Sequence, residues 1–313
     1  MAPVQNALTE QFSAQRSHLI AVAYRLTGSL ADSEDAVQEA WVRLRTLPAA
    51  KRDAIQELRA WLTTVVGRIC LDRLRSATAR REQYVGDWLP EPIITPLGGQ
   101  PGEDPLDAVV REDGVRMAAM VVLDTLSPEQ RVAFVLHDAF AVPFAEIGEI
   151  LGCSADTARQ HASRGRRAVA AADPPSRASL DDQREVLERF MAAVASGDVR
   201  AVAEVLHPDV VFVGDSDGRA RTTRRTMVGA EKITRFFQGL LTTYRPGAFL
   251  TAQPVLVNGD LGMYVPAAPG GEGYRDLDAH VQTMTVRDGL IVAIYDQANP
   301  EKLARIVRQL SQG

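Results

Sequence analysis

The chain has 313 residues, of which 46% are hydrophobic and 24% charged, and its formal net charge is −5. This length predicts two or three domains, and the composition is typical of a folded protein rather than a disordered one. The chain has no run of about 18 apolar residues that could span a membrane, no recognisable signal peptide, and no motif around Cys70 or Cys153. We therefore expect a cytoplasmic protein. Its mild acidity argues against a nucleic-acid-binding protein, unless the charge is divided along the chain.

Residues 8–82 are predicted to form an all-α domain. One apolar stripe recurs at the helical period at Ala36, Val37, Ala40, Trp41 and Leu44. A second stripe follows over residues 58–74, and Trp61 lies on it, so we expect Trp61 in the core. Gly28 is expected to separate the first helix from the second, which either Asp32 or Ser33 can cap.

Residues 83–113 are predicted to be a linker, because five prolines among several glycines break any helix. The segment contains seven acidic residues and one arginine, a net charge of −6. Trp88 and Leu89 are unusual residues to leave in solvent. Two interpretations stay open: a disordered spacer, or a segment that docks on another part of the chain.

Residues 114–172 are predicted to be helical again and to contain a helix-turn-helix. Ser127–Gln130 closely matches a capping box with proline at the first helical position. A short helix over about 143–151 ends at Gly152, and Ser154 can cap a second helix that runs to about residue 172. The second helix has a narrow face of small residues at Ala158, Ala162, Gly165 and Val169 that can pack on the first.

Arginines gather on two of the predicted helices. Segment 154–172 has four arginines and one aspartate, a net charge of +3, and segment 59–81 has six arginines and one aspartate, a net charge of +5. A helix in the major groove needs donors for base edges in its N-terminal half and arginines for phosphates. The candidates for base contacts are Arg159, Gln160, Ser163 and Arg164, and those for phosphate contacts are Arg166 and Arg167. The helix-turn-helix pattern alone is also compatible with a solvated, arginine-rich face of a bundle.

Residues 181–313, after a second linker at 173–180, change from an all-helical to a mixed pattern. Helices are predicted at about 181–196, 198–206, 229–243 and 300–310. Strands are predicted at 210–213, 248–257, 260–266, 277–287 and 289–297, with a hairpin turn at Asp288-Gly289. Helices followed by a long antiparallel meander predict an α+β domain with a curved sheet wrapped on helices.

Three segments, taken together and in this order, resemble bacterial sigma factors of the extracytoplasmic-function (ECF) type. Ser33–Trp41 resembles the region 2 helix that docks on the β′ coiled coil of RNA polymerase, and Arg68–Arg75 resembles the helix that meets the −10 element. Leu126–Arg131 and the following helix-turn-helix resemble region 4, which reads the −35 element and touches the β flap. The resemblance implies a transcription factor without enzymatic activity, cofactor or metal, whose partners are core RNA polymerase and promoter DNA.

The resemblance also assigns residues to these roles. Polymerase binding is expected of Glu34, Asp35, Gln38, Glu39 and Trp41. Contact with the −10 element is expected of Arg68, Asp72, Arg73 and Arg75, which the apolar stripe leaves on or near an exposed flank.

The rest of the chain resembles the group of these sigma factors, including the SigJ type, that carries a C-terminal SnoaL-like (NTF2-like) domain. Its signatures correspond to Trp88–Pro92, Asp215–Arg219 and Asn299–Leu303, although Ser216 and Asp217 replace two glycines and Glu301 replaces an aspartate. We expect the linker to dock on the C-terminal domain near Asp215–Arg219 and to regulate the sigma domains through this contact. The residues expected at this contact are Trp88, Leu89, Pro90, Asp215, Asp217, Gly218, Arg219, Asn299, Pro300 and Lys302.

A second interpretation of the C-terminal domain stays open. Related folds host enzymes in which carboxylates in an apolar cone act as bases. The candidates here are Asp215, Asp217, Asp278, His280 and Asp296. Because one fold hosts many functions, the alternative is a DNA-binding regulator fused to a SnoaL-type enzyme or to a sensor of an unidentified small ligand.

Overall fold

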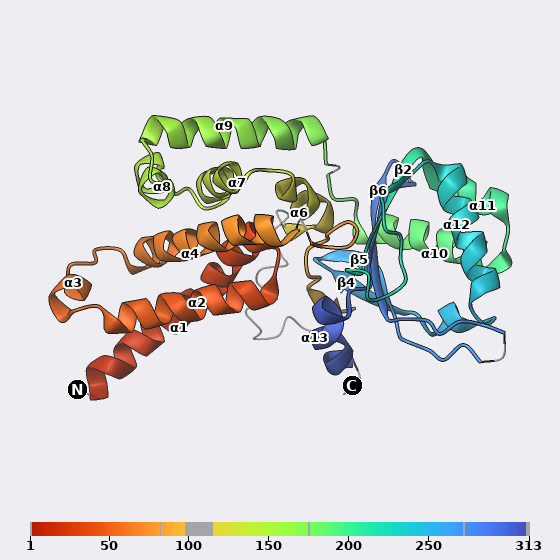
Figure 1. Cartoon of the computed structure of the whole chain (residues 1–313), viewed down its shortest axis with the longest axis horizontal. Coiled ribbons are helices and arrows are strands. Elements are labelled where there is room, and N and C mark those ends of the chain that lie inside the picture. The colour runs from red at the N-terminus through yellow and green to blue at the C-terminus, as the bar shows by residue number, and fades with distance from the viewer. Residues whose placement is uncertain (1, 82, 98–114, 175, 272, 311–313) are drawn as a thin grey trace. The chain divides into compact units, whose positions relative to one another are not determined.

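The computed structural model describes residues 2–81, 83–97, 115–174, 176–271 and 273–310 (Figure 1). The chain divides into two compact units. The first comprises the described parts of Met1–Gln83, Pro101–Val115 and Ala119–Pro174. The second comprises the described parts of Tyr84–Gln100, Arg116–Ala118 and Pro175–Gly313. Residues 84–97, the described part of the expected linker, therefore belong to the C-terminal unit.

The first unit is built from helices, and α6 begins in the second unit. The helices are α1 (Ala2–Thr27), α2 (Leu30–Thr46), α3 (Ala49–Asp53), α4 (Leu58–Arg81), α6 (Met117–Asp124), α7 (Pro128–Phe134), the π-helical turn η2 (Val135–Ala139), α8 (Phe144–Leu151) and α9 (Ala155–Ala172). Helices α1, α2 and α4 pack on one another through fully buried side chains, among them Tyr24, Leu44 and Leu62. Burial of this apolar surface is the main stabilising contribution to such a bundle.

Helix α2 begins earlier than the sequence predicts. The capping residue is Ser29, whose Oγ accepts a hydrogen bond from the backbone N–H of Asp32 at 3.2 Å, so the expectation of Asp32 or Ser33 is wrong. Gly28 precedes it with φ 68°, a left-handed conformation that glycine adopts without strain. The physical reason is burial, because Leu30 and Ser33 both lie in the core and are therefore inside the helix.

The helix-turn-helix consists of α8, a three-residue turn and α9. Gly152 adopts the left-handed conformation at φ 71°, and the Oγ of Ser154 accepts from the backbone N–H of Thr157 at 3.2 Å. The small face of α9 is buried as expected at Ala158, Ala162 and Gly165, whereas Val169 is half-buried. A side chain on Gly165 would lie 2.9 Å from the Cβ of Phe134, so only glycine permits this approach of α9 to α7.

The second unit is a seven-stranded sheet with helices. Its elements are β1 (Ile94–Pro96), α10 (Leu180–Ser196), α11 (Val199–Val205), β2 (Leu206–Asp215), β3 (Met227–Val228), α12 (Ala230–Thr243), the 3-10 turn η3 (Ala248–Thr251), β4 (Gln253–Val257), β5 (Asp260–Val265), β6 (His280–Arg287), β7 (Leu290–Gln297) and α13 (Pro300–Leu310). The strand order is β1-β4-β5-β6-β7-β2-β3. Helices α10, α11 and α12 gather beside this sheet in Figure 1 and contact β5, β6, β2 and β7.

The antiparallel meander expected over 248–297 is confirmed, because β4, β5, β6 and β7 pair antiparallel in chain order. Two features of the sheet were not predicted. The sheet as a whole is mixed, because β2 pairs with β7 in parallel, with Phe212 opposite Ile294. The chain can return in this direction because α12 and four strands separate β2 from β7 in sequence. The expected strand at 248–257 begins only at Gln253, since residues 248–251 form a 3-10 turn.

The main core of this unit lies between the helices and the sheet. Phe190 of α10, Phe212 of β2 and Phe237 of α12 are buried, and their rings meet edge to face with centroids 5.1 to 5.9 Å apart. Ile233, Ile291 and Ile294 complete the same cluster. This core fixes the sheet beneath the strand ends that hold Asp215 and Asp296.

Candidate nucleic-acid interface and linker-binding site

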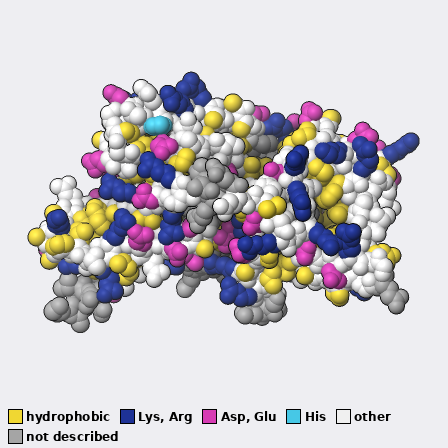
Figure 2. All heavy atoms as spheres, in the orientation of Figure 1, with side chains coloured by type: hydrophobic (Ala, Val, Ile, Leu, Met, Phe, Trp, Pro, Cys, Tyr) yellow, Lys and Arg dark blue, Asp and Glu magenta, His cyan; other side chains and the backbone are white. Residues whose placement is uncertain are grey.

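The outward face of α9 is basic. Arg159, Gln160, Arg164, Arg166 and Arg167 are exposed and Ser163 is half-buried, and Figure 2 shows Lys and Arg side chains gathered over this helix. Arg159 contacts Asp156 at 2.5 Å and lies over the ring of Phe144 at 5.2 Å. Arg166 contacts Asp138 of η2 at 2.6 Å. These side-chain contacts orient the two arginines but leave more than half of each side chain accessible, as a surface that binds a polyanion requires.

The four residues expected on the exposed flank of α4 do not share one environment. Asp72 is exposed, and Arg68 donates from Nη2 to the backbone carbonyl of Glu149 at 3.1 Å. Arg75 makes two hydrogen bonds, at 3.0 and 3.1 Å, to one carboxylate oxygen of Glu129. Arg73 instead turns toward α2, where its Nη1 lies 2.8 Å from Asp32, so it is less accessible than Arg75.

Helices α7 and α8 pack directly on α4. A Cβ at Gly67 of α4 would lie 3.0 Å from Leu136 and 3.3 Å from Ile150, so the absence of a side chain permits this close contact. The hydroxyl of Thr64 donates to Glu146 at 3.3 Å. The buried Arg131 of α7 donates from Nε to the carbonyl of Arg25 in α1 at 3.2 Å. The helix-turn-helix segment therefore covers part of the basic helix α4 in this conformation.

Asp215, at the end of β2, binds the linker within the second unit. Its side chain is fully buried, and it accepts hydrogen bonds from Tyr84 Oη at 2.5 Å and from the backbone N–H of Leu89 at 2.7 Å. Lys302 of α13 donates from Nζ to Asp215 at 2.6 Å and to the carbonyl of Leu89 at 2.6 Å. Gln297 adds a fourth donor at 3.2 Å. A buried carboxylate needs a full set of donors of this kind to offset its lost hydration.

Aromatic side chains of the linker surround the same lysine. The ammonium of Lys302 lies 4.3 Å from the ring centroid of Trp88 and 5.3 Å from that of Tyr84, so both rings make cation–π contacts with it. Asn299 donates from Nδ2 to Tyr84 Oη at 2.9 Å. Burial and the neighbouring Asp215 carboxylate raise the pKa of Tyr84, so its hydroxyl stays protonated and donates. Leu89 and Pro90 are buried, whereas Pro300 is exposed.

The Asp215–Arg219 loop binds the linker at Val85. Asp217 accepts from the backbone N–H of Val85 at 3.1 Å, and Gly218 approaches the side chain of Val85 closely enough that a Cβ would lie 3.1 Å from it. Asp217 adopts a left-handed φ of 50° and Gly218 one of 68°. Aspartate tolerates this conformation, so the replacement of a glycine at position 217 preserves the turn and adds an acceptor. Arg219 pairs with Glu301 across the loop.

Comparison with known proteins now gives the family. A model for sigma-70 region 2 matches residues 12–80, one for sigma-70 region 4 matches residues 116–169, and one for a SnoaL-like domain matches residues 187–294. The ECF RNA polymerase sigma factor SigJ of Mycobacterium tuberculosis is 52% identical over 295 residues, which cover 93% of this chain and 92% of that protein. The chain belongs to the ECF RNA polymerase sigma factors. Residues 12–80 are called region 2 below, residues 116–169 region 4 and residues 187–294 the SnoaL-like domain.

Two further comparisons agree with this assignment. The "Probable ECF RNA polymerase sigma factor SigI" of M. tuberculosis is 32% identical, and the match covers 96% of each chain. A crystal structure of the M. tuberculosis ECF sigma factor SigJ superposes with a TM-score of 0.79 at 50% identity, covering 95% of this chain and 98% of that one. The sigma factor thus has two helical sigma domains and a C-terminal SnoaL-like domain, as the sequence indicates.

The expected polymerase-binding residues lie on α2 of region 2. Asp35 and Gln38 are exposed, and Glu34, Glu39 and Trp41 are half-buried. Trp41 packs on the ring of Phe12 with centroids 4.8 Å apart, and Arg45 lies over the Trp41 ring, 5.8 Å from its centroid. Glu39 pairs with Arg43 one turn along the helix at 2.5 Å. The five side chains therefore form a mixed acidic and aromatic surface on one helix.

The five acid–base candidates of the SnoaL-like domain occupy two separate places. Asp215 and Asp217 hold the linker, whereas His280 and Asp296 form a buried pair with Nδ1 3.0 Å from the carboxylate. Burial alone would lower the pKa of His280, but the Asp296 carboxylate outweighs it and raises this pKa. Burial opposes ionisation of Asp296, yet His280, Thr222 and Gln282 hold its pKa below the usual range. Asp278 accepts from the backbone N–H of Arg221 at 2.9 Å.

The apolar cavity beside this pair is small. It measures about 40 Å³ and is lined by Phe190, Phe237, Met263 and Gln282, among others, whereas ligand pockets typically enclose ~300–1,000 Å³. Gln282 links it to Asp296 by a hydrogen bond of 3.0 Å. The cavity in this conformation does not favour a ligand of the size that such domains enclose.

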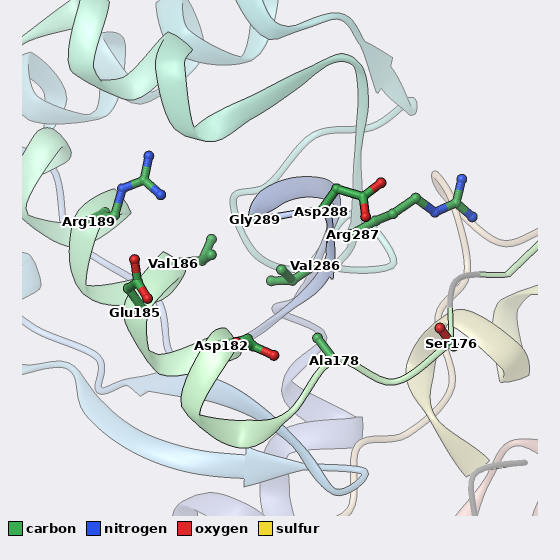
Figure 3. A pocket seen from close by; sticks show the side chains of 10 residues that line it. All are labelled: Ser176, Ala178, Asp182, Glu185, Val186, Arg189, Val286, Arg287, Asp288 and Gly289. Atoms are coloured by element: carbon green, nitrogen blue, oxygen red, sulfur yellow. The ribbon is translucent and has the colours of Figure 1, made fainter.

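A larger, open cleft of about 420 Å³ lies between α10 and the β6–β7 turn (Figure 3). Its rim carries Asp182, Glu185 and Asp288 together with Arg189 and Arg287. Charges of both signs line it, so its charge alone favours neither an anion nor a cation. Within the described ranges, no three His, Cys, Asp or Glu side chains gather to hold a metal ion. No helix in the described part of the chain is long and apolar enough to cross a membrane.

Several residues at these contacts were missed by the sequence analysis. Tyr84 and Gln297 hold Asp215, and Asp260 binds both Arg116 and Arg177. Tyr84 offered a weak signal, because it lies next to Trp88 in a polar segment. Asp260 offered none, since a carboxylate after a hairpin turn is usually solvated.

Proposed function

We propose that this sigma factor reads the −35 element of its promoters through the N-terminal half of α9. The observation that carries the proposal is the exposed row of Arg159, Gln160 and Arg164 on the second helix of a helix-turn-helix. Arginine and glutamine side chains at this position can donate to base edges in the major groove. Arg166 and Arg167, farther along the same helix, are proposed to bind phosphates. Region 4 is also proposed to touch the β flap of the polymerase.

Contact with the −10 element is proposed for α4 after region 4 has moved away. Arg75 would exchange the Glu129 carboxylate for a phosphate, which is also an anionic acceptor, and Arg68 would exchange the backbone carbonyl of Glu149 for a phosphate. The packed conformation would then be an inactive form of the free protein. Arg73, which is held by Asp32, is proposed to shape region 2 rather than to touch DNA.

The acidic and aromatic face of α2, which includes Asp35, Gln38 and Trp41, is proposed to bind the β′ coiled coil. The SnoaL-like domain is proposed to act on the sigma domains through the linker. Support comes from the four donors on the buried Asp215, two of which belong to linker residues Tyr84 and Leu89. A linker held in this way cannot follow another path through the polymerase until those hydrogen bonds break.

The −35 assignment is tested by Arg159→Ala in the full-length protein bound to core polymerase. We expect the free energy of promoter binding to become less favourable by about 1–3 kcal/mol and the preference for one base of the −35 element to weaken. Binding is measured on promoters that differ at single positions, with Arg184→Ala, an exposed arginine of α10, as the matched control. Unchanged affinity together with an unchanged base preference would overturn the assignment of Arg159.

A further inference from the structure

The turn between β4 and β5 gathers three distant segments of the chain. Asn258 and Gly259 form this two-residue turn, with left-handed φ values of 53° and 81°. The side-chain oxygen of Asn258 accepts from the backbone N–H of Ile93 at 2.9 Å, and the backbone N–H of Asn258 donates to the carbonyl of Ile93 at 2.8 Å. Asp260 follows and is buried. The turn therefore binds the linker at Ile93, in addition to the arginines that Asp260 binds.

Asp260 binds one arginine with each carboxylate oxygen. Arg116 donates from Nε to Oδ2 at 2.8 Å, and Arg177 donates from Nε to Oδ1 at 2.9 Å. Arg177 also donates to the carbonyl of Asn258 at 3.2 Å, and Gln183 approaches Oδ1 at 3.4 Å. The Arg116 and Asp260 side chains are only 7% and 5% exposed. The group is thus a buried carboxylate with a full set of donors rather than a surface ion pair.

The two arginines lie at the two ends of region 4. Arg116 is the first residue of the region 4 match, and Arg177 follows the last helix of that region by a few residues. One carboxylate therefore ties together the point where the chain enters region 4 and the point where it leaves. Everything between them, including the helix-turn-helix, forms a closed loop of chain that starts and ends at Asp260.

We propose that Asp260 is a positioning residue for promoter recognition, which holds both ends of region 4 on the SnoaL-like domain while α9 engages DNA. The inference rests on the proposed reading of the −35 element by α9. Burial favours a permanent joint over a switch, because separating the charges would leave a buried ion without a partner. In the proposed promoter-bound state, region 4 separates from α4 while its two ends stay at Asp260. Because the linker that follows region 2 is held on the same domain, the chain then limits how far α9 can lie from region 2.

The consequence is selection of promoters by the distance between their two elements. A tethered binding module has a high effective concentration only where the tether allows it to reach. With both ends fixed, α9 reaches the −35 element over a narrow range of spacer lengths. Freeing the ends widens this range, even if every contact between α9 and the bases is unchanged.

The test measures transcription by the full-length protein with core polymerase on promoters whose spacer is changed one base pair at a time. The test variants are Arg177→Ala, which frees the exit end, and Asp260→Asn, which frees both. We expect the ratio of transcripts from lengthened to optimal promoters to rise by about threefold or more, a small part of what altered effective concentration can produce. Arg177→Lys keeps the charge and should recover part of the wild-type ratio.

Asp288→Asn is the matched control, because Asp288 lies in the other hairpin turn of the same sheet. A merely structural role would lower transcription from every promoter by one common factor and leave the ratio unchanged, and that result would overturn the inference. Arg177 is partly exposed, so its variant keeps the test decisive if Asp260→Asn does not fold. If the wild-type protein directs transcription from no promoter, the proposed function is wrong. That result differs from an unchanged spacer ratio, which overturns only the role of Asp260.

Discussion

At the scale of single residues, buried charge marks the contacts that matter most in this sigma factor. Asp215 has no exposed surface and collects donors from the linker, β7 and α13. Removal of one partner from a buried ion pair usually costs ~3–5 kcal/mol, because the other charge remains in the interior. The pairing of this carboxylate with Lys302 is therefore expected to be a main contribution to docking of the linker around Leu89.

Asp215→Asn should release the linker. We expect the free energy of unfolding of the C-terminal unit to fall by about 3 kcal/mol, because the amide places donors against Leu89 N–H and Lys302. In a background with Trp41→Phe and Trp61→Phe, the emission of Trp88 should shift to the red as its ring loses Lys302. Urea unfolding and Trp88 fluorescence measure the two effects. Asp209→Asn, an exposed carboxylate of the same strand, is the control, and equal behaviour of both variants would refute the role of Asp215.

His18 is expected to make the stability of region 2 depend on pH. Its Nδ1 accepts from Arg59 at 2.9 Å, which can only donate, and its Nε2 contacts the Thr63 hydroxyl at 2.9 Å. Burial, with Arg59 and Arg25 nearby, lowers the pKa of His18 from its ordinary value of 6.5 to about 4. The folded state therefore binds its proton only at a lower pH than the unfolded state does.

The sign of the effect follows from proton linkage. Stability from neutral His18 is fully present above pH 6.5 and is lost as the pH falls from 6.5 toward about 4. His18→Gln should make the free energy of unfolding less dependent on pH across this window, which urea unfolding at several pH values measures. His207→Gln serves as the control. Parallel pH profiles for the wild type and His18→Gln would show that His18 does not titrate in this way.

At the scale of elements, glycines set how closely helices approach. A Cβ on Gly148 of α8 would lie 2.8 Å from the carbonyl oxygen of Cys153 in the helix-turn-helix turn, and this backbone atom cannot turn aside. Gly239 of α12 has open space around its Cα instead. Both glycines lie in helices, but a side chain would clash at Gly148 and would find open space at Gly239.

Gly148→Ala should therefore destabilise the helix-turn-helix, and Gly239→Ala should stabilise α12 by up to about 1 kcal/mol through helix propensity. Thermal unfolding compares the two variants, and binding to a −35 sequence should weaken only for Gly148→Ala. Equal stabilisation by both substitutions would mean that the close contact at Gly148 is not restrictive.

The elements also show what a sequence can predict. Helix periodicity and capping signals located α7, α8 and α9 well, because local hydrogen bonds at Ser127 and Ser154 decide where those helices begin. The start of α2 was missed because burial of Leu30, a tertiary effect, extends the helix to Ser29. The parallel pairing of β2 with β7 and the strand β1 within the linker depend on contacts between distant segments, which no local pattern contains.

The candidate site was predictable to a similar degree. Trp88 and Leu89 carried a signal, because apolar residues in an acidic linker need a partner, and Asp215 was indicated by the family resemblance. The environment of Arg73 did not, since its partner Asp32 lies on another helix. The two salt bridges of Asp260, to Arg116 and to Arg177, join positions far apart in the sequence, so no local sequence pattern predicts them.

At the scale of the whole molecule, the net charge of −5 averages opposite contributions. The segments 59–81 and 154–172 carry net charges of +5 and +3, and the linker segment 83–113 carries −6. Basic helices attract DNA phosphates, while a low total charge limits non-specific binding. The chain is therefore expected to depend on core polymerase for much of its affinity for promoters.

A sigma factor directs core RNA polymerase to specific promoters, and this activity can be measured for the present chain. The most direct measurement is run-off transcription with purified core polymerase and the purified full-length chain on fragments of its own genome. We expect transcripts that start at defined positions and that are absent when core polymerase acts alone. Transcripts that start at the same positions and in the same amounts with and without the chain would contradict this expectation.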